Sequence, residues 1–263
     1  MKHDFHALYR RPLQAIALLT RIPIRVKWED DLKWGGLVGC FPLAGYIVGG
    51  ISLAAAWAWL RFAPAWGNAP VSYASAAAAL LVLIGAWLTG ALHLDGWADL
   101  CDGCFASVTR ERRLEIMSDP HLGGFGITSL ILLLLLKTSA VSSMLAFADA
   151  ANPPIILLVA PVMARWAAAV ALSFKPVPLA NPNGMAAMVR NGLTPFQPIL
   201  ATILLAPVFI LACHTAIVAA AVSIAAAAVV LAFARAKLGG LNGDVLGAII
   251  EFSETVTLLV TQC

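Results

Sequence analysis

Nine of the fourteen acidic residues in this chain lie in two short stretches, residues 93–119 and 239–254. Carboxylates are costly near a bilayer and are rarely placed there without a function. Two such clusters in an otherwise apolar chain predict a multiply charged cation between them. A hard divalent metal ion that holds a phosphate fits these oxygen ligands best.

The first stretch, HLDGWADLCDG, spaces Asp95, Asp99 and Asp102 at i, i+4 and i+7. On a helix these side chains share one face, where like charges repel one another. A bound cation removes that repulsion, and carboxylates without nearby imidazole suit Mg²⁺, Mn²⁺ or Ca²⁺ better than zinc. A solvated acidic helix end is the alternative. The trio directly continues an apolar segment, so we predict three metal ligands.

In the second stretch, GGLNGDVLGAIIEFSE, Asp244 and Glu251 lie seven residues apart, again on one helical face. We predict both as further metal ligands, with Glu254 one turn beyond. The surrounding glycines allow a phosphate or a partner helix to approach the backbone closely. The alternative is that Glu251 and Glu254 pair with Lys137 or Arg165, the two cations expected inside membrane spans.

Three arginines follow the first cluster, and a histidine precedes it. Arg110, Arg112 and Arg113 are predicted to bind phosphate, because guanidinium groups suit bidentate contacts with it. Ordinary enrichment of cations in cytoplasmic loops is the alternative. His93 is a candidate base or hydrogen-bonding residue, although a single histidine is more often structural.

Composition indicates a single integral membrane domain over residues 1–263. The chain is 61% hydrophobic and 12% charged, with a mean hydropathy of +0.87. Soluble domains carry about twice that share of charge. The net charge of +3 gives no reason to expect nucleic acid as a partner. Five irregularly spaced cysteines, including one isolated CxxC, predict neither a disulfide framework nor a zinc site.

The apolar runs predict an all-α, polytopic bundle of about seven transmembrane spans in a lipid bilayer. Each run is near the ~20 residues that a bilayer requires. An amphipathic, basic helix is expected before them, over residues 9–28. The predicted spans are residues 36–60, 71–94, 125–148, 154–174, 195–213, 214–234 and 244–262.

Lysine and arginine alternate between successive connections, with seven of them in residues 1–35 alone. The positive-inside rule then places the N-terminus in the cytoplasm. Both acidic clusters fall on that same side of the membrane. A joint site is therefore possible, although 150 residues separate the clusters in sequence.

At these motifs the chain resembles the cobalamin synthases, the adenosylcobinamide-GDP ribazoletransferases of bacterial vitamin B12 assembly. The resemblance runs from about residue 14 to 258. The matching strings are TRIPI (20–24), FPLAG (41–45), HLDGWADLCDG (93–103), RERRLEIMSDPHLGGFG (110–126) and GGLNGDVLGAIIEFSE (239–254).

The resemblance implies a multi-pass enzyme of the bacterial inner membrane that requires Mg²⁺ and has a cytoplasmic active site. Such an enzyme joins adenosylcobinamide-GDP to α-ribazole or its 5′-phosphate and releases GMP. Carried over by motif, the five carboxylates above would form the metal shell, and Arg110 and Arg112 would bind phosphate. The motif does not identify the base, for which Asp119 is our candidate among the carboxylates. Further candidates for substrate contact are Arg113, Asn242, Lys137, Arg165 and Glu254. Homo-oligomers and complexes with other corrinoid-pathway enzymes are open.

The chain departs from the family pattern in three places. The arginine that often follows the first DG motif is absent, and Arg110 is the first cation there. Asn242 replaces the usual threonine before GD, which removes a hydroxyl but keeps a hydrogen-bonding side chain. His121 stands where a basic residue is common.

Three other functions compete with this one. Asp99-x-x-Asp102-Gly-x-x-Ala106 opens the metal motif of CDP-alcohol phosphotransferases, but the rest of that motif is not intact. An ion-coupled transporter would use Glu251, Glu254 and the two intramembrane cations as a relay. A non-catalytic scaffold would explain neither the carboxylate spacing nor the glycines.

Overall fold

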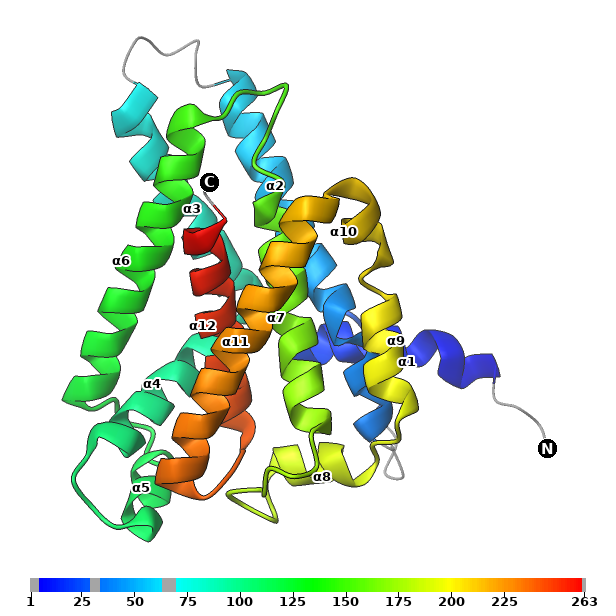
Figure 1. Ribbon diagram of the computed structural model, residues 1–263, viewed down its shortest axis with the longest axis vertical. Helices are drawn as coiled ribbons and strands as arrows, with labels where there is room; N and C mark the ends of the chain where they lie inside the picture. The colour runs from blue at the N-terminus through cyan, green and yellow to red at the C-terminus, as the bar shows by residue number, and fades with distance from the viewer. Residues whose placement is uncertain (1–4, 29–33, 63–69, 262–263) are drawn as a thin grey trace.

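The structure, a computed structural model, describes residues 5–28, 34–62 and 70–261. Within these ranges it is all-helical, and the only β-type pairing is an isolated bridge between Leu179 and Leu241. The predicted all-α class is confirmed. Figure 1 shows the long helices running side by side, with the short helices α5 (Arg110–Ile116) and α8 (Met185–Asn191) at one end.

Four segments of the described chain are long and apolar enough to cross a membrane. They are Trp34–Phe62, which joins the 3₁₀ helix η1 (Trp34–Cys40) to α2 (Phe41–Phe62), then α6 (Gly124–Phe147), α7 (Ile156–Ser173) and α11 (Cys213–Leu238). Two sharply bent helix pairs raise the number to six if each is one broken span. The expected count of about seven is not confirmed.

The predicted span 71–94 is wrong at its end, because the chain turns inside it. Helix α3 (Pro70–Thr89) stops, Gly90 and Ala91 adopt positive φ angles of 62° and 58°, and α4 (Leu92–Phe105) leaves at 91°. The predicted span 195–213 is also divided, into α9 (Phe196–Ile203) and α10 (Ala206–Leu211), and this segment lies 97° from α8. An apolar run shows that a segment is buried or lipid-facing, but not that it is straight.

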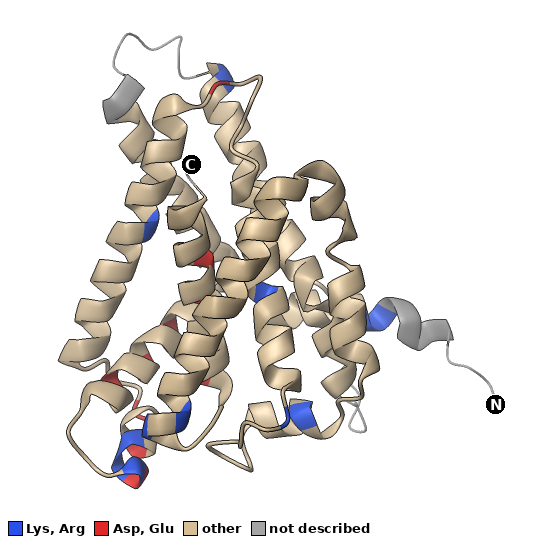
Figure 2. Cartoon of the chain, viewed as in Figure 1, with Lys and Arg blue, Asp and Glu red and all other residues tan. Residues whose placement is uncertain are grey.

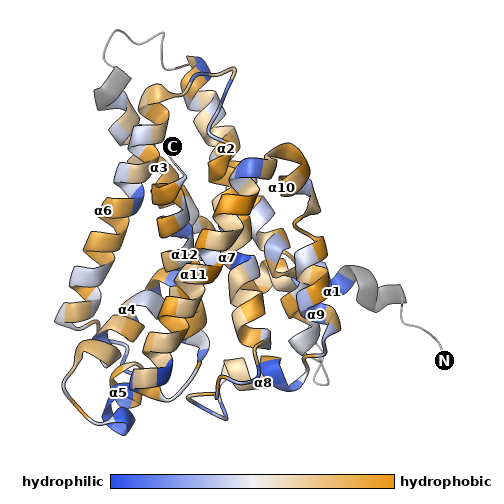
Figure 3. Ribbon diagram, in the orientation of Figure 1, coloured by the Kyte–Doolittle hydropathy of each residue, from blue (hydrophilic) through white to orange (hydrophobic). Residues whose placement is uncertain are grey.

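The last helix, α12 (Gly243–Val260), lies inside the bundle. It packs against α4, α6, α7 and α11, and its side chains are largely buried. It contains three acidic residues, Asp244, Glu251 and Glu254, and is not among the four apolar segments above. Figures 2 and 3 show the same contrast over the whole molecule. Apolar residues follow the long helices, and charged residues gather at the end that carries α5.

Close packing between the central helices depends on glycine. A Cβ atom at Gly45 or Gly49 of α2 would lie 2.6–2.7 Å from carbonyl oxygens of α7. Such contacts let two helices approach to backbone distance, as is common in membrane bundles.

The N-terminal helix α1 spans Phe5–Leu19 and not residues 9–28 as predicted. Residues 21–28 have no regular secondary structure, and Pro23 disfavours helical geometry at Ile22. Residues Ala15 and Leu19 are buried in the main core, so α1 packs into the bundle through its apolar side.

Candidate active site

Helix α4 carries the first acidic cluster. Asp95 is exposed, Asp99 is half-buried and Asp102 is buried. The carboxylates of Asp95 and Asp99 have no hydrogen-bond or ion-pair partner within the described ranges. Like charges surround Asp99, since Asp95, Asp244 and Asp102 all act on it electrostatically. Helix α4 therefore presents two carboxyl groups that no described cation pairs with.

Helix α12 brings Asp244 to the same place. A Cβ atom at Gly96 of α4 would lie 2.8 Å from the carbonyl oxygen of Asp244, so the two backbones touch. Asn242 is the N-cap of α12, where its Oδ1 accepts from the Val245 N–H at 2.9 Å, and its Nδ2 donates to Asp244 Oδ2 at 2.9 Å. The asparagine that replaces the usual threonine thus fixes both the helix start and the Asp244 carboxylate.

These carboxylates fit a hard divalent cation by chemical type. Oxygen donors without imidazole are the ligands that Mg²⁺ prefers. Among the described residues, however, no three His, Cys, Asp or Glu side chains converge tightly enough to enclose a metal ion. Asp95, Asp99 and Asp244 are neighbours whose side chains would have to rotate toward a shared ion.

Asp102 is engaged elsewhere. Its two oxygens accept the N–H groups of Gly123 and Gly126, each at 2.7 Å, at the start of α6. A Cβ atom at either glycine would fall within 2.5 Å of this carboxylate. Asp102 therefore caps α6 and joins it to α4. The sequence analysis missed this role. The glycines at positions 123 and 126 are the one hint of it in the sequence, since they leave room for a side chain at the start of α6.

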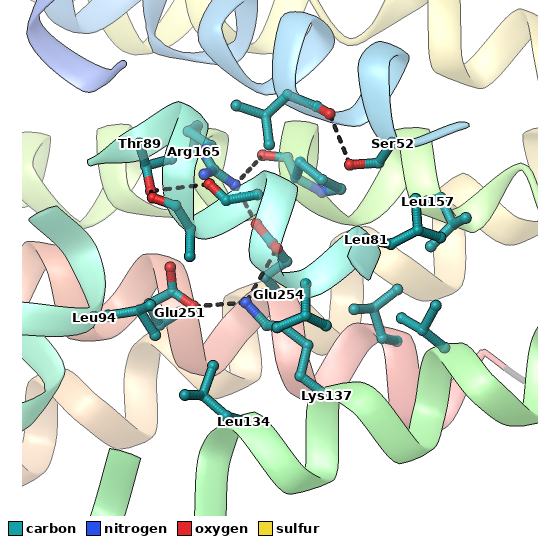
Figure 4. Close-up of a pocket in the computed structure, with 17 residues that line it drawn as sticks. Ser52, Leu81, Thr89, Leu94, Leu134, Lys137, Leu157, Arg165, Glu251 and Glu254 are labelled. Atoms are coloured by element: carbon teal, nitrogen blue, oxygen red, sulfur yellow. Dashed lines mark hydrogen bonds and ion pairs between the residues drawn. The ribbon is translucent and has the colours of Figure 1, made fainter. Parts of the chain in front are cut away.

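Glu251 and Glu254 lie away from the aspartates, in a buried ion network (Figure 4). Lys137 Nζ of α6 donates to Glu251 Oε2 at 2.6 Å and to Glu254 Oε1 at 3.2 Å. Arg165 of α7 donates to the other oxygen of Glu254. This is the pairing that the sequence analysis held as its alternative. Glu251 is placed with Lys137, not with the predicted metal ligands.

A small cavity of about 40 Å³ adjoins this network, lined by all four charged residues and by aliphatic side chains of α2, α3, α6 and α7. It has room for a few water molecules and is far smaller than a typical ligand pocket. Arg165 Nε is buried without a partner in the described structure and can be satisfied by such a water. The network thus ties α12 to α6 and α7.

The three arginines predicted to bind phosphate are used differently. Arg110 donates to the carbonyls of Leu238 and Ala180, at 2.6 and 3.2 Å, where α11 ends. Arg113 donates to the Cys104 carbonyl at 2.7 Å, where α4 ends. Both satisfy carbonyls that a helix end leaves unpaired. Arg112 forms an exposed pair with Glu115 at 2.7 Å.

In the described structure, neither residue predicted to act as acid or base makes a hydrogen bond or ion pair with the aspartates of α4 and α12. His93 is buried on the face of α4 that packs on Gly247 of α12, and neither ring nitrogen has a partner in the described structure. Asp119 is half-exposed in the loop before α6 and accepts from the backbone N–H of His121 at 2.9 Å. That hydrogen bond, with the one from the His121 ring, lowers the pKa of Asp119, which makes it a weaker base.

Comparison with known proteins identifies the family. The pattern of cobalamin-5-phosphate synthases matches residues 11–262. Adenosylcobinamide-GDP ribazoletransferase of Geobacillus kaustophilus (strain HTA426) is 38% identical, with 93% of this chain and 92% of the relative covered. The proteins of the same name from Brevibacillus brevis and Pseudomonas paraeruginosa are 34% and 33% identical, with at least 94% of each chain covered. No solved structure matches. The chain belongs to the cobalamin-5-phosphate synthase family, whose members are transferases of cobalamin biosynthesis.

Proposed function

We propose that this enzyme joins adenosylcobinamide-GDP to α-ribazole or its 5′-phosphate, releases GMP and requires Mg²⁺. The observation that carries the proposal is the end-to-end match to relatives of that name, over 93–94% of this chain in the three compared above. The contact between α4 and α12 near their acidic residues also supports it. A diphosphate is negatively charged, so carboxylates can bind it only through a divalent cation that they hold.

The reaction transfers one phosphoryl group. A hydroxyl of the acceptor attacks the phosphorus that bears cobinamide, the bond to the GMP oxygen breaks, and the hydroxyl proton passes to a base. Asp95, Asp99 and Asp244 would hold Mg²⁺, which would neutralise the diphosphate and the leaving GMP. Asn242 fixes the Asp244 carboxylate in place through its 2.9 Å hydrogen bond.

We place the site at the cytoplasmic side of a bacterial inner membrane. Charged residues gather at the end of the molecule that carries α5, and the long helices between the two ends carry few of them (Figure 2). Cations concentrate on cytoplasmic connections of membrane proteins. The carboxylates of α4 and the start of α12 would then meet soluble, charged substrates without crossing the hydrocarbon layer.

The test is a reconstituted reaction in detergent with adenosylcobinamide-GDP, α-ribazole and Mg²⁺, in which GMP and the corrinoid product are both measured. We expect cobalamin formation that EDTA abolishes and that Asp95→Asn reduces by about 100-fold or more, as expected when transition-state charge stabilisation is lost. Asp149→Asn is the matched control, since it makes the same chemical change outside the acidic clusters.

A well-folded, Mg²⁺-loaded preparation that forms neither product would refute the assignment of substrates. Release of CMP from a CDP-alcohol by that preparation would support the competing phosphotransferase. An equal loss of activity in the Asp95→Asn and Asp149→Asn variants would contradict the assignment of Asp95 as a metal ligand.

A further inference from the structure

The turn between α3 and α4 is contacted by the start of the irregular segment, residues 21–28, that follows α1. The backbone N–H of Arg21 donates to the Leu88 carbonyl at 2.6 Å, at the end of α3. A Cβ atom at Gly90 would lie 2.4 Å from Arg21 Nε and 2.5 Å from its Cγ. The Arg21 side chain therefore lies directly on Gly90, whose positive φ of 62° also favours glycine.

The guanidinium of Arg21 is available to a ligand. Arg21 is exposed and has no hydrogen bond or ion pair through its side chain to any described residue. By contrast, Arg110 and Arg113 already donate to carbonyls, and Arg112 is paired with Glu115. Of the cations discussed near α4, only Arg21 makes no side-chain hydrogen bond or ion pair with another described residue.

Arg21 also lies near the acidic residues. Gly90 precedes α4 by two residues, and the Asp95 N–H bonds to the Ala91 carbonyl, so Asp95 is in the first turn. Helix α4 begins at Leu92, and its backbone rises only about 4–5 Å from there to Asp95. A diphosphate held by a cation at Asp95 and Asp99 extends several ångströms, which is within reach of a guanidinium seated over Gly90.

We infer that Arg21 is a substrate-binding residue that contacts the diphosphate of the nucleotide-activated substrate. The inference rests on the proposed function. A guanidinium offers two parallel N–H donors to phosphate oxygens, and its charge offsets the electron pair that leaves with the nucleotide oxygen. Its attachment to Leu88 and Gly90 presets its position, so little conformational freedom is lost on binding.

The experiment compares Arg21→Gln with Arg25→Gln in the detergent-purified full chain. Arg25 lies on the same segment and is also exposed, so the two variants make the same charge change four residues apart. Arg21→Lys is the third variant, since lysine keeps the positive charge but lacks the two parallel N–H donors of the guanidinium group. The measurements are kcat and KM for adenosylcobinamide-GDP, and the Kd for GDP with Mg²⁺ present.

We expect Arg21→Gln to weaken GDP binding and kcat/KM by about 10- to 100-fold, the range for losing a charged hydrogen bond. Arg25→Gln should change either quantity less than twofold, and Arg21→Lys should fall between. Thermal unfolding should be the same in all three, because the Arg21 backbone hydrogen bond remains.

Wild-type GDP binding in Arg21→Gln, or equal losses in the two glutamine variants, would overturn the inference. The two proposals fail separately. If wild-type protein binds GDP but forms no cobalamin, the proposed function is wrong, and a selective loss of GDP binding in Arg21→Gln would still support the diphosphate contact.

Discussion

Replacing Lys137 with methionine removes the centre of the buried ion network. Its Nζ contacts Glu251 at 2.6 Å and Glu254 at 3.2 Å, and these side chains are 9%, 6% and 12% exposed. Methionine keeps the length and apolar stem of lysine but has no charge. Glu254 keeps Arg165, whereas Glu251 loses its only ion-pair partner among the described residues.

The expected cost follows from that burial. Removing one partner of a buried ion pair typically destabilises a protein by about 3–5 kcal/mol, because a charge is left uncompensated. For a chain of this size about 1 kcal/mol corresponds to roughly 2–4 °C, so the melting temperature should fall by about 6–20 °C. The double variant Lys137→Met with Glu251→Gln leaves no unpaired charge and should return to within about 1 kcal/mol of the wild type.

Thermal unfolding in detergent measures these changes, and the exposed pair between Arg112 and Glu115 provides the control. Its separation is 2.7 Å, close to that of the buried pair, but both side chains are 63% exposed. Solvent screening limits such a pair to about 0–1 kcal/mol, so Arg112→Met should shift the melting temperature by less than about 4 °C. Equal shifts for the buried and exposed variants, or a double variant no better than Lys137→Met, would refute the reasoning.

Two further substitutions test the contacts that position α4. Gly96→Ala would place a methyl group 2.8 Å from the Asp244 carbonyl, so α4 and α12 must separate at a cost of about 1–3 kcal/mol. Gly50→Ala, which meets nothing within 4 Å, should leave thermal unfolding and activity unchanged, and a similar result for Gly96→Ala would contradict the close packing. Asp102→Asn keeps one acceptor for the two glycine N–H groups and should destabilise the fold by about 1–3 kcal/mol in the same assay. Normal stability with lost Mg²⁺ dependence would instead make Asp102 a metal ligand.

The sequence predicted the elements better than their bends. Apolar runs located α2, α6, α7 and α11 because length and hydropathy determine whether a segment suits a bilayer. Nothing in LTGALHLDG distinguishes a glycine tolerated within a helix from one that ends it. Arg21 packs on the turn at Gly90 from about seventy residues earlier, and such a tertiary contact cannot be read from the local sequence.

The candidate site was predicted in part, for a geometric reason. Counting cations placed both acidic clusters on one side of the membrane, and Asp95, Asp99 and Asp244 are indeed neighbours. Glu251 was assigned to them because it shares a helical face with Asp244. Seven residues of helix also rise about 10 Å, which carries Glu251 to Lys137. A shared face is necessary for a shared site but not sufficient.

The arginines show a second limit of sequence analysis. A guanidinium donates equally well to a phosphate and to the carbonyls at a helix end, so composition cannot separate the two uses. The structure separates them by geometry, since Arg110 and Arg113 lie at the ends of α11 and α4, whereas the Arg21 side chain donates to no residue of the described ranges.

The residues that hold the helices together are therefore largely different from the carboxylates that we propose take part in the reaction. Asp102 fastens α4 to α6, and Lys137 and Arg165 fasten α12 to α6 and α7. Asp95 and Asp99 make no such bond in the described structure, so neutralising either should relieve repulsion and leave the fold intact. Substitution of Asp95 or Asp99 should therefore reduce activity without reducing stability. Substitution of Asp102, Lys137 or Arg165 should reduce both.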